Sequence, residues 1–450
     1  MSVINQYINL YTEHGDVIEH HSTEVLNALR PEALKVLLNT PLPKAGTENY
    51  ENCDPEGMLS PDYGINLAKL PIDVNPRDTF KCDVPTLSQK LSMLINDTYA
   101  ESTGEWHLPD GVEIGSLREA AERDAEFIAK FYGKGAQLEN PFVALNTLLA
   151  EDGFYLRVKK GVKLEQPLQL VNILENGMPL MAIRRLLIVI EEGAEAKLLV
   201  CDHTQNPEID FLSLETVEIF VAENADFDYY SLEESSAKTS RISALYLNQA
   251  ANSRVNIDGL TLFNGVTRNE YYCNFNGSHA ELSLYGLAIE DDQRKVSTYS
   301  HIRHNYPDCK SDELFKHTAD DEAIASFTGR IFVDYGASGT EAYQANRNLI
   351  GSDSARIMSR PELEIYNDDV KCSHGSAIGR LDQNQLFYLR TRGLDEAQAK
   401  LLLKQAFMSD VIDKIRIPNL RDKLHLMVER RFAGEKSACR NCSLHGKTCK

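Results

Sequence analysis

The stretch that decides the fold is RRLLIVIEEGAEAKLLVCD, residues 184–202. Two short runs rich in Leu, Ile and Val flank the small-residue turn Gly193-Ala194-Glu195-Ala196. Such runs between polar or small turns are typical of β-strands. Similar runs precede and follow it, as LQLVNIL, TVEIFVAENADFDYYSL and SRVNIDGLTLF. We therefore expect a body of short strands from about residue 138 onward.

The turns between these runs repeat weakly. Related turns begin at Asn224, Asn252 and Gly277, which puts the first positions 31, 28 and 25 residues apart, and Ser354-Ala355 and Gly375-Ser376 look similar. A small residue or one that tolerates a left-handed backbone, followed by a return to strand at a steady period, indicates a solenoid of stacked β coils. A large antiparallel sandwich, whose strands are also short and evenly spaced, is the alternative.

The sequence on either side of the strands has helical patterning. STEVLNALRPEALKVLL, TLSQKLSMLI and SLREAAERDAEFIAKFY carry apolar residues at helical spacing. Toward the C-terminus, Asp395 is the predicted N-cap of one helix, and a second amphipathic helix follows Pro418. The predicted regions are a helical and irregular part (1–137), a β core (138–387), a helical domain (388–432) and a cysteine-rich tail (433–450).

Composition and charge restrict the function. The 450 residues carry 67 acidic and 47 basic side chains, a net charge of −20. This balance argues against broad binding to nucleic acids or anionic membranes, because both need clustered Lys and Arg. The N-terminus shows no leader pattern, and the longest apolar run, 186–190, is too short to span a bilayer. We expect a cytoplasmic protein whose nine cysteines are thiols, metal ligands or reactive groups rather than disulfides.

One candidate site lies in DDVKCSHGSAIGRLD, residues 368–382, which contains Cys372 and His374. On a strand, residues two apart point to the same face. A thiolate and an imidazole both bind iron or zinc, and an imidazolium could also hold Cys372 as the thiolate. Two ligands do not close a metal site, so a partner chain or further residues would complete it. From these two residues alone, a buried cysteine beside an ordinary histidine remains the alternative.

A second group of metal-binding residue types occurs in HIRHNYPDC, which holds His301, His304, Asp308 and Cys309. The spacing matches no closed-site pattern, and a polar turn is predicted there instead.

The tail contains Cys439, Cys442, His445 and Cys449. Four soft ligands within eleven residues could surround one zinc ion tetrahedrally, and a thiol-rich tail without metal is the alternative. Gly446-Lys447-Thr448 is not the end of a phosphate loop, because Asn441 stands where that loop needs glycine. The absence of nucleotide-binding and hydrolase motifs favours a binding or scaffold role.

The residues from 360 to 394, RPELEIYNDDVKCSHGSAIGRLDQNQLFYLRTRGL, resemble the SufD family of the SUF iron–sulfur cluster assembly machinery. The resemblance extends upstream through 313–350, where Phe327, Gly329 and Gln344-Ala345-Asn346-Arg347-Asn348-Leu349 fit the family. It is compatible, though looser, over the rest of the chain.

This resemblance implies a right-handed parallel β-helix between N-terminal and C-terminal helical regions. It implies a SufB–SufC2–SufD complex, in which a SufB-like subunit pairs through the β-helices and the helices around 394–432 dock SufC, an ABC-type ATPase. Cys372 and His374 would then lie at the SufB interface and bind iron or a nascent cluster. The chain would be a scaffold without enzymatic activity of its own, because ATP hydrolysis belongs to SufC. The resemblance implies no role for the cysteine-rich tail.

Two other functions stay open at this point. The chain could be a stand-alone metal-binding β-solenoid, or a purely architectural subunit with an inert Cys372. Without a SufB-like partner, an exposed solenoid edge makes a homodimer plausible.

Overall fold

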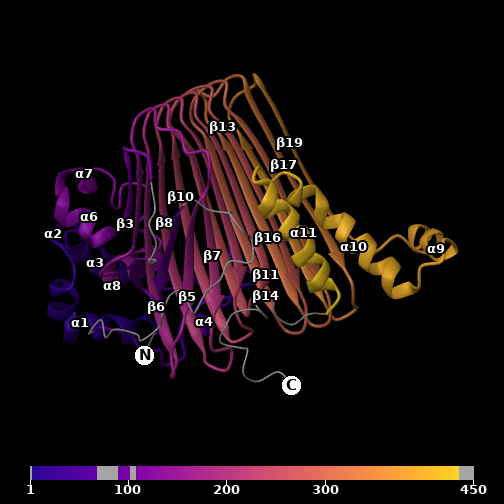
Figure 1. Cartoon of the computed structure of the whole chain (residues 1–450), viewed down its shortest axis with the longest axis horizontal. Helices are drawn as coiled ribbons and strands as arrows, with labels where there is room; N and C mark the ends of the chain where they lie inside the picture. Colours follow the sequence, from indigo (N-terminus) through magenta and orange to yellow (C-terminus); the bar gives the residue numbers. More distant parts are fainter. Residues whose placement is uncertain (1–2, 68–89, 102–107, 435–450) are drawn as a thin grey trace.

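The structure, a computed structural model, describes residues 3–67, 90–101 and 108–434. It is mainly β, with helices at both ends of the described chain (Figure 1). The described helices are α1 (Ile4–His20), α2 (Glu24–Asn27), α3 (Arg30–Asn39), α4 (Pro55–Leu59), α6 (Leu117–Arg123), α7 (Ala125–Ala129), α8 (Pro141–Leu149), α9 (Gln383–Thr391), α10 (Glu396–Ile412) and α11 (Pro418–Phe432).

The described strands form two sheets. They are β1 (Lys90–Ile95), β2 (Thr98–Glu101), β3 (Val112–Ser116), β4 (Phe154–Val158), β5 (Leu168–Leu174), β6 (Leu180–Ile190), β7 (Glu195–Thr204), β8 (Phe211–Val221), β9 (Asp226–Glu234), β10 (Thr239–Gln249), β11 (Arg254–Phe263), β12 (Val266–Phe275), β13 (Glu281–Glu290), β14 (Lys295–His304), β15 (Lys310–Ala319), β16 (Ile324–Val333), β17 (Thr340–Ile350), β18 (Arg356–Ile365) and β19 (Val370–Gly379).

The chain alternates between the sheets, so each coil contributes one strand to each. The ten-stranded sheet has the order β19-β17-β15-β13-β11-β9-β7-β5-β1-β2, and the nine-stranded sheet has the order β18-β16-β14-β12-β10-β8-β6-β4-β3. From β4 and β5 onward, neighbouring strands pair in parallel. This parallel stacking confirms the β-solenoid and excludes the antiparallel sandwich, in which sequential strands would run in opposite directions.

Residues with a left-handed backbone conformation recur at the turns that lead into the strands of the ten-stranded sheet. Positive φ occurs one or two positions before a strand resumes, at Gly193, Asn224, Asn252, His279, Asp308 and Gly339. Each of these residues donates its backbone N–H to the corresponding turn of the next coil, as in Gly193 N to Glu223 O at 2.9 Å. Glycine and Asn or Asp tolerate this conformation best, which explains the repeated turn residues in the sequence.

Two details of the predicted turn repeat are wrong. In the turn that begins at Gly277, the left-handed residue is His279, so the period is steadier than the sequence suggested. Gly375-Ser376 is not a turn, because both residues lie within β19. A short sequence repeat cannot reveal which of several small residues takes the unusual φ, because the pairing with the next coil selects it.

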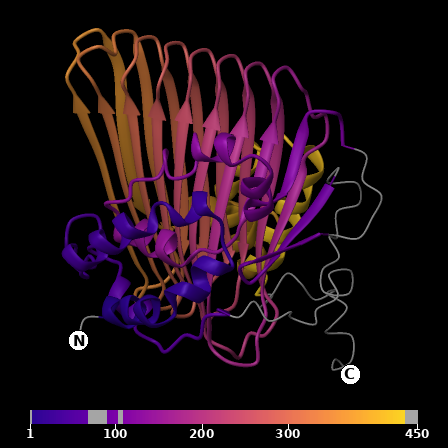
Figure 2. The same ribbon diagram turned by 90° about the vertical axis from the view of Figure 1, so that its left-hand side faces the viewer.

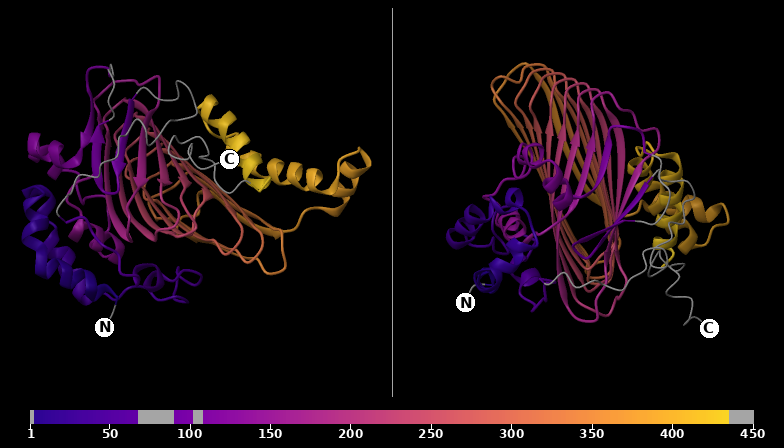
Figure 3. Two further views of the ribbon diagram at one scale, coloured as in Figure 1. Left: turned by 60° about the horizontal axis from the view of Figure 1, so that its bottom comes forward. Right: turned by 60° about the vertical axis from the view of Figure 1, so that its left-hand side comes forward.

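Three apolar layers hold the molecule together. The interior of the solenoid is filled from both sheets, by residues such as Leu198 and Ile257 of the ten-stranded sheet and Val217 of the nine-stranded sheet. The C-terminal helices α10 and α11 cover the outer face of the ten-stranded sheet, and α1, α3 and α8 cover the outer face of the nine-stranded sheet. Figures 2 and 3 show the N-terminal and C-terminal helices on opposite sides of the solenoid.

One helix predicted in the N-terminal region is wrong. TLSQKLSMLI does not form a helix over its described part, because Lys90–Ile95 is β1 and pairs in parallel with β5. Its apolar residues fit a buried strand between β2 and β5 as well as a helix stripe, and tertiary pairing selects the strand. Sheet membership does not define folding units, so the boundaries at 137, 387 and 432 stay predictions.

The C-terminal helices agree with the prediction. Asp395 caps α10 in a capping box with Gln398, and Pro418 starts α11. Arg431 fixes the end of α11 to the solenoid by bonding the Asp291 carboxylate and the carbonyl oxygens of Leu262 and Ile289. Within the described ranges, no helix is both long enough and apolar enough to cross a bilayer.

Glu290, at the end of β13, carries a testable pH dependence. It is 1% exposed. Burial and the nearby Glu233 raise the pKa of Glu290 to about 8, although Arg431 and Arg294 oppose the shift. The neutral carboxyl therefore stabilises the fold below the ordinary pKa of 4.5, and this stabilisation is lost as the pH rises through about 8.

We expect Glu290→Gln to gain thermal stability relative to the wild type as the pH rises from 5 to 8. The amide cannot ionise, so the variant avoids the loss that the wild type suffers. Calorimetric melting temperatures across this range measure the difference. Glu281→Gln, at an exposed site, is the control and should show a flat difference. A flat difference for Glu290→Gln as well would contradict the raised pKa.

Candidate functional site

The candidate site lies at the C-terminal end of the solenoid, where the coils stop. Cys372 and His374 are both on β19, which ends the ten-stranded sheet and pairs there with β17 alone. On the other sheet, β18 is the corresponding last strand. The far backbone edge of β19 therefore faces no further strand within the described part of the chain, and such an edge is a template for pairing with another chain.

Cys372 faces the solenoid interior. It lies opposite Ala342 of β17 and packs against the interior core cluster. Its side chain is half-buried, and burial raises the pKa of the thiol above its ordinary value, although a hydrogen bond with the Ala342 backbone opposes the shift. A thiol in such surroundings must lose its proton when it binds a metal ion.

Exposure distinguishes Cys372 from the other described cysteines. Cys53, Cys201, Cys273 and Cys309 are all buried, whereas Cys372 is partly exposed at the end of the solenoid. Since reactive or metal-binding thiols need access, Cys372 is the described cysteine best suited to exchange a ligand.

His374 ends a row of polar side chains that continues into the solenoid. The register of the parallel strands aligns His374 with Gln344 of β17 and Gln344 with Glu313 of β15. The same row further inside is apolar, with Leu284 and Ile257 in the core cluster. The polar row is therefore confined to the last coils.

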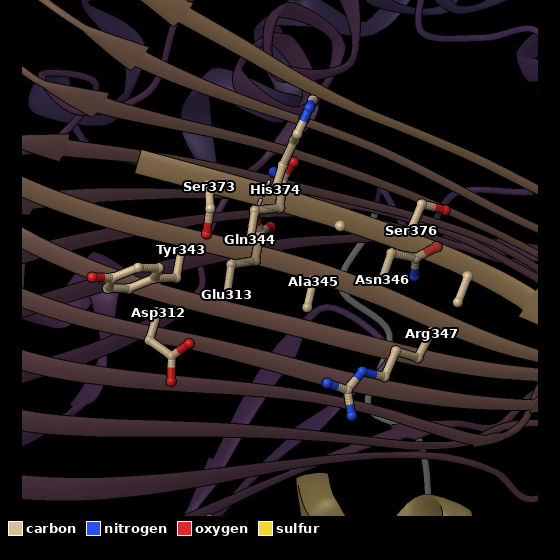
Figure 4. Close-up of a pocket in the computed structure, with 12 residues that line it drawn as sticks. Asp312, Glu313, Tyr343, Gln344, Ala345, Asn346, Arg347, Ser373, His374 and Ser376 are labelled. Atoms are coloured by element: carbon tan, nitrogen blue, oxygen red, sulfur yellow. Dashed lines mark hydrogen bonds between the residues drawn. The ribbon is translucent and has the colours of Figure 1, made fainter. Parts of the chain in front are cut away.

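Figure 4 shows Glu313, Gln344 and His374 on successive strands, with their side chains on the side of the sheet opposite Asp312, Tyr343 and Arg347. These residues line a pocket of about 370 Å³ together with Ala345, Asn346, Ser373, Gly375, Ser376 and Ala377. Ser376 also donates a hydrogen bond to Ser359 of β18 at 2.7 Å, which links the two sheets at the open end.

The electrostatics of the last coils favour neutral groups. Burial raises the pKa of Glu313 to about 7. Burial lowers the pKa of His304 to about 3 and that of His317 to about 4, so both imidazoles are neutral near pH 7. The interior behind Cys372 and His374 is thus polar but carries little fixed charge.

Comparison with known protein families identifies the chain. The core-domain model of the SufBD proteins, described as SUF system FeS cluster assembly, matches residues 173–407, and the model of the SufBD N-terminal region matches residues 1–170. The chain belongs to the SufBD family. The resemblance found in the sequence is confirmed, and the chain takes part in iron–sulfur cluster assembly as a member of this family.

Individual relatives span almost the whole chain. The iron–sulfur cluster assembly protein SufD of Escherichia coli (strain K12) is 27% identical over 422 residues, which is 92% of this chain and 96% of that protein. SufD of Bacillus subtilis (strain 168) is 24% identical over 445 residues, 96% of this chain and 98% of that protein. A SufBD family protein of Synechocystis sp. is 27% identical over 411 residues, with coverage of 89% and 90%.

The second group of metal-binding residue types in this SufBD protein, for which the sequence predicts a polar turn, lies partly on a strand. His301 and His304 lie on β14 rather than in a turn, whereas Asp308 is one of the left-handed turn residues. Cys309 follows it in a position that small buried residues such as Ala225 and Ala280 take in other coils. The polar-turn prediction is therefore right for Asp308 and wrong for the histidines.

The third predicted group, Cys439, Cys442, His445 and Cys449, lies outside the described residues, so its zinc site stays a prediction. Over residues 3–67, 90–101 and 108–434, no three His, Cys, Asp or Glu side chains converge closely enough to hold a metal ion.

Sequence reasoning missed Glu313 and Gln344 as neighbours of His374. The available signal is the alternation Gln344, Asn346, Asn348, which places three buried amides on one face of β17. The sequence alone could not align this strand with His374, because the register between coils depends on the length of each turn.

Proposed function

We propose that this SufBD protein is a scaffold subunit of a SufB–SufC2–SufD-type complex for iron–sulfur cluster assembly. In this proposal Cys372 and His374 supply ligands to iron or a nascent cluster at the interface with a SufB-like subunit. The cluster is the cargo of the complex. A SufC-like ABC ATPase docks on the C-terminal helices and supplies the ATP hydrolysis, so this chain is not itself an enzyme.

One observation carries the proposal: the metal-binding residue types lie on the last strand of the solenoid, whose outer edge is unpaired in the described part of the chain. A second β-solenoid can continue the sheet there by backbone pairing. Such pairing would enclose the half-buried Cys372 and the exposed His374 between two chains. Without a partner, the same edge favours a homodimer.

An interface site suits the temporary binding of a cluster. Two ligands from one chain leave the coordination shell incomplete, and the partner chain would complete it. Thiolate and imidazole ligands both bind iron. A shell divided between two subunits can open when the interface moves, for example when ATP binding brings two SufC subunits together and shifts the complex toward an open state.

The C-terminal helices offer a surface for the ATPase. Figures 1 and 3 show α9 and one end of α10 extending away from the solenoid. Tyr388 and Leu402 on these helices are 56% and 45% exposed, respectively. Exposed aromatic and aliphatic side chains are common anchors of protein interfaces.

We expect Tyr388→Ala combined with Leu402→Asp to weaken SufC-like binding by about 2 kcal/mol, roughly thirtyfold, as for loss of an interface anchor. Titration calorimetry with the purified ATPase measures the affinity. Leu38→Asp on α3, where the leucine is 63% exposed, is the matched control and should bind normally. Equal binding by the double variant and the wild type would exclude this docking surface.

The function itself is tested by co-expressing the chain with SufB-like and SufC-like proteins and purifying the complex without oxygen. The proposal predicts a stable complex that contains all three proteins and binds iron and sulfide. A stand-alone metal-binding protein would hold its metal without the partners. If no complex forms with either partner, the proposed scaffold role is wrong.

A further inference from the structure

The buried side-chain amide of Gln344 has no role in the cluster site proposed above. Its side chain is 3% exposed, and its Nε2 donates a hydrogen bond to Oε2 of Glu313 at 2.6 Å. Its carbonyl oxygen, Oε1, has no hydrogen-bond partner among the described residues. A buried amide oxygen without a partner loses its hydration without compensation, so such an atom calls for a physical explanation.

The position of Gln344 supplies this explanation. The residue directly opposite it on β19 is His374, and adjacent strands lie about 4.8 Å apart, within reach of two long side chains. Figure 4 shows both side chains on the same side of the sheet. Both residues also line the same pocket of about 370 Å³.

The orientation of the Gln344 amide is restrained from two sides. When it is ionised, the Glu313 carboxylate accepts a hydrogen bond from the NH2 end of the amide, which leaves the carbonyl oxygen without a partner. On the opposite sheet, a Cβ added to Gly329 would lie 2.4 Å from Nε2 of Gln344, so the amide packs closely against the backbone there. The ionised Glu313 therefore orients the amide before any ligand arrives.

A histidine that binds a metal ion through one ring nitrogen usually donates its other N–H to an oxygen acceptor. This bond selects the tautomer and the ring orientation, and its loss typically weakens metal binding by about 10–100-fold. At the open end of this solenoid, the carbonyl oxygen of Gln344 is the buried acceptor next to His374.

We infer that Gln344 is a positioning residue for His374, accepting a hydrogen bond from the imidazole N–H when the other ring nitrogen binds iron. Glu313 holds the amide in the orientation that this bond requires. The inference rests on the proposed function, because it assumes that His374 is a metal ligand. Gln344, on the neighbouring strand, would contact the His374 side chain and not the metal ion itself.

The test uses the anaerobically purified complex with its SufB-like and SufC-like partners, and Co²⁺ as the probe. The absorption of cobalt bound to thiolate and imidazole reports the affinity and the ligand environment. Gln344→Leu removes the acceptor and leaves an apolar side chain that ends at Cδ, one atom shorter than glutamine. Asn348→Leu is the matched control, because Asn348 is a buried amide on the same strand that lies opposite Ile378 rather than His374. Both substitutions are also made in a His374→Ala background.

We expect Gln344→Leu to lower the cobalt affinity by about 10–100-fold in the wild-type background and to have no effect once His374 is alanine. Asn348→Leu should leave the affinity unchanged. An equal loss in both backgrounds, or an equal loss for Asn348→Leu, would mean that Gln344 only maintains the fold and would overturn the inference.

The remaining outcomes separate this inference from the proposed function. If His374→Ala weakens cobalt binding and Gln344→Leu does not, the positioning role is wrong and the function stands. If His374→Ala itself has no effect, His374 is not a ligand, and the proposed ligand role and the positioning role fail together.

Discussion

A complex that carries Cys372→Ala and His374→Ala is expected to assemble normally but to lose at least about nine-tenths of its iron and sulfide, as expected when direct ligands are removed. Both substitutions act on the last strand, where Cys372 is half-buried and His374 is exposed, so little core packing is lost. The measurement is iron and acid-labile sulfide per complex after anaerobic purification, together with the ratio of the three proteins.

The strand offers a matched control. Lys371 and Ser373 alternate with the two ligand candidates and are exposed on the opposite face of β19, where Lys371 pairs with Glu341. Lys371→Ala, which changes a residue outside the pocket lining, should therefore alter the same strand and leave the iron content unaltered. Unchanged iron and sulfide in the Cys372/His374 variant would favour the purely architectural role. A parallel loss in both variants would point to the strand rather than to its ligands.

Glu218→Ala is expected to destabilise the protein by roughly 3–5 kcal/mol, the range for removing one partner of a buried ion pair. Glu218 of β8 and Arg185 of β6 form an ion pair with both side chains fully buried. The same carboxylate accepts the backbone N–H groups of Gly133, Gly135 and Ala136 at 2.9–3.0 Å. Removal leaves one buried guanidinium and three backbone donors without this acceptor.

The structure also predicts where the Glu218→Ala protein opens first. The three N–H groups belong to the segment that joins α7 to α8, so hydrogen exchange should rise there before it rises in the solenoid strands. Urea unfolding gives the free energy of unfolding. Glu223→Ala, an exposed change a few residues further along the chain, should stay within about 0.5 kcal/mol of the wild type. A loss below about 1 kcal/mol for Glu218→Ala would show that the segment has other acceptors.

The C-terminal half of the sequence specified its fold well. The strand runs, the small turn residues and Asp395 as a helix cap all act locally, so their pattern is visible without tertiary information. Cys372 and His374 could be selected as a pair for the same reason, since a strand places residues two apart on one face. In the N-terminal part the local pattern misled, because pairing of Lys90–Ile95 with β5 overrode the helical spacing.

By itself, the sequence determined that the chain has a strand-rich body with helical ends, and it placed Cys372 and His374 on one strand face, whereas the parallel pairing of the coils decided between a solenoid and an antiparallel sandwich. The tertiary structure decided that this strand is the last one, that its edge is open, and that Gln344 and Glu313 stand beside His374. The physical reason is the range of the interactions. Residue alternation is set by neighbouring peptide units, whereas the register between coils depends on turns and pairing some 30 residues apart along the chain.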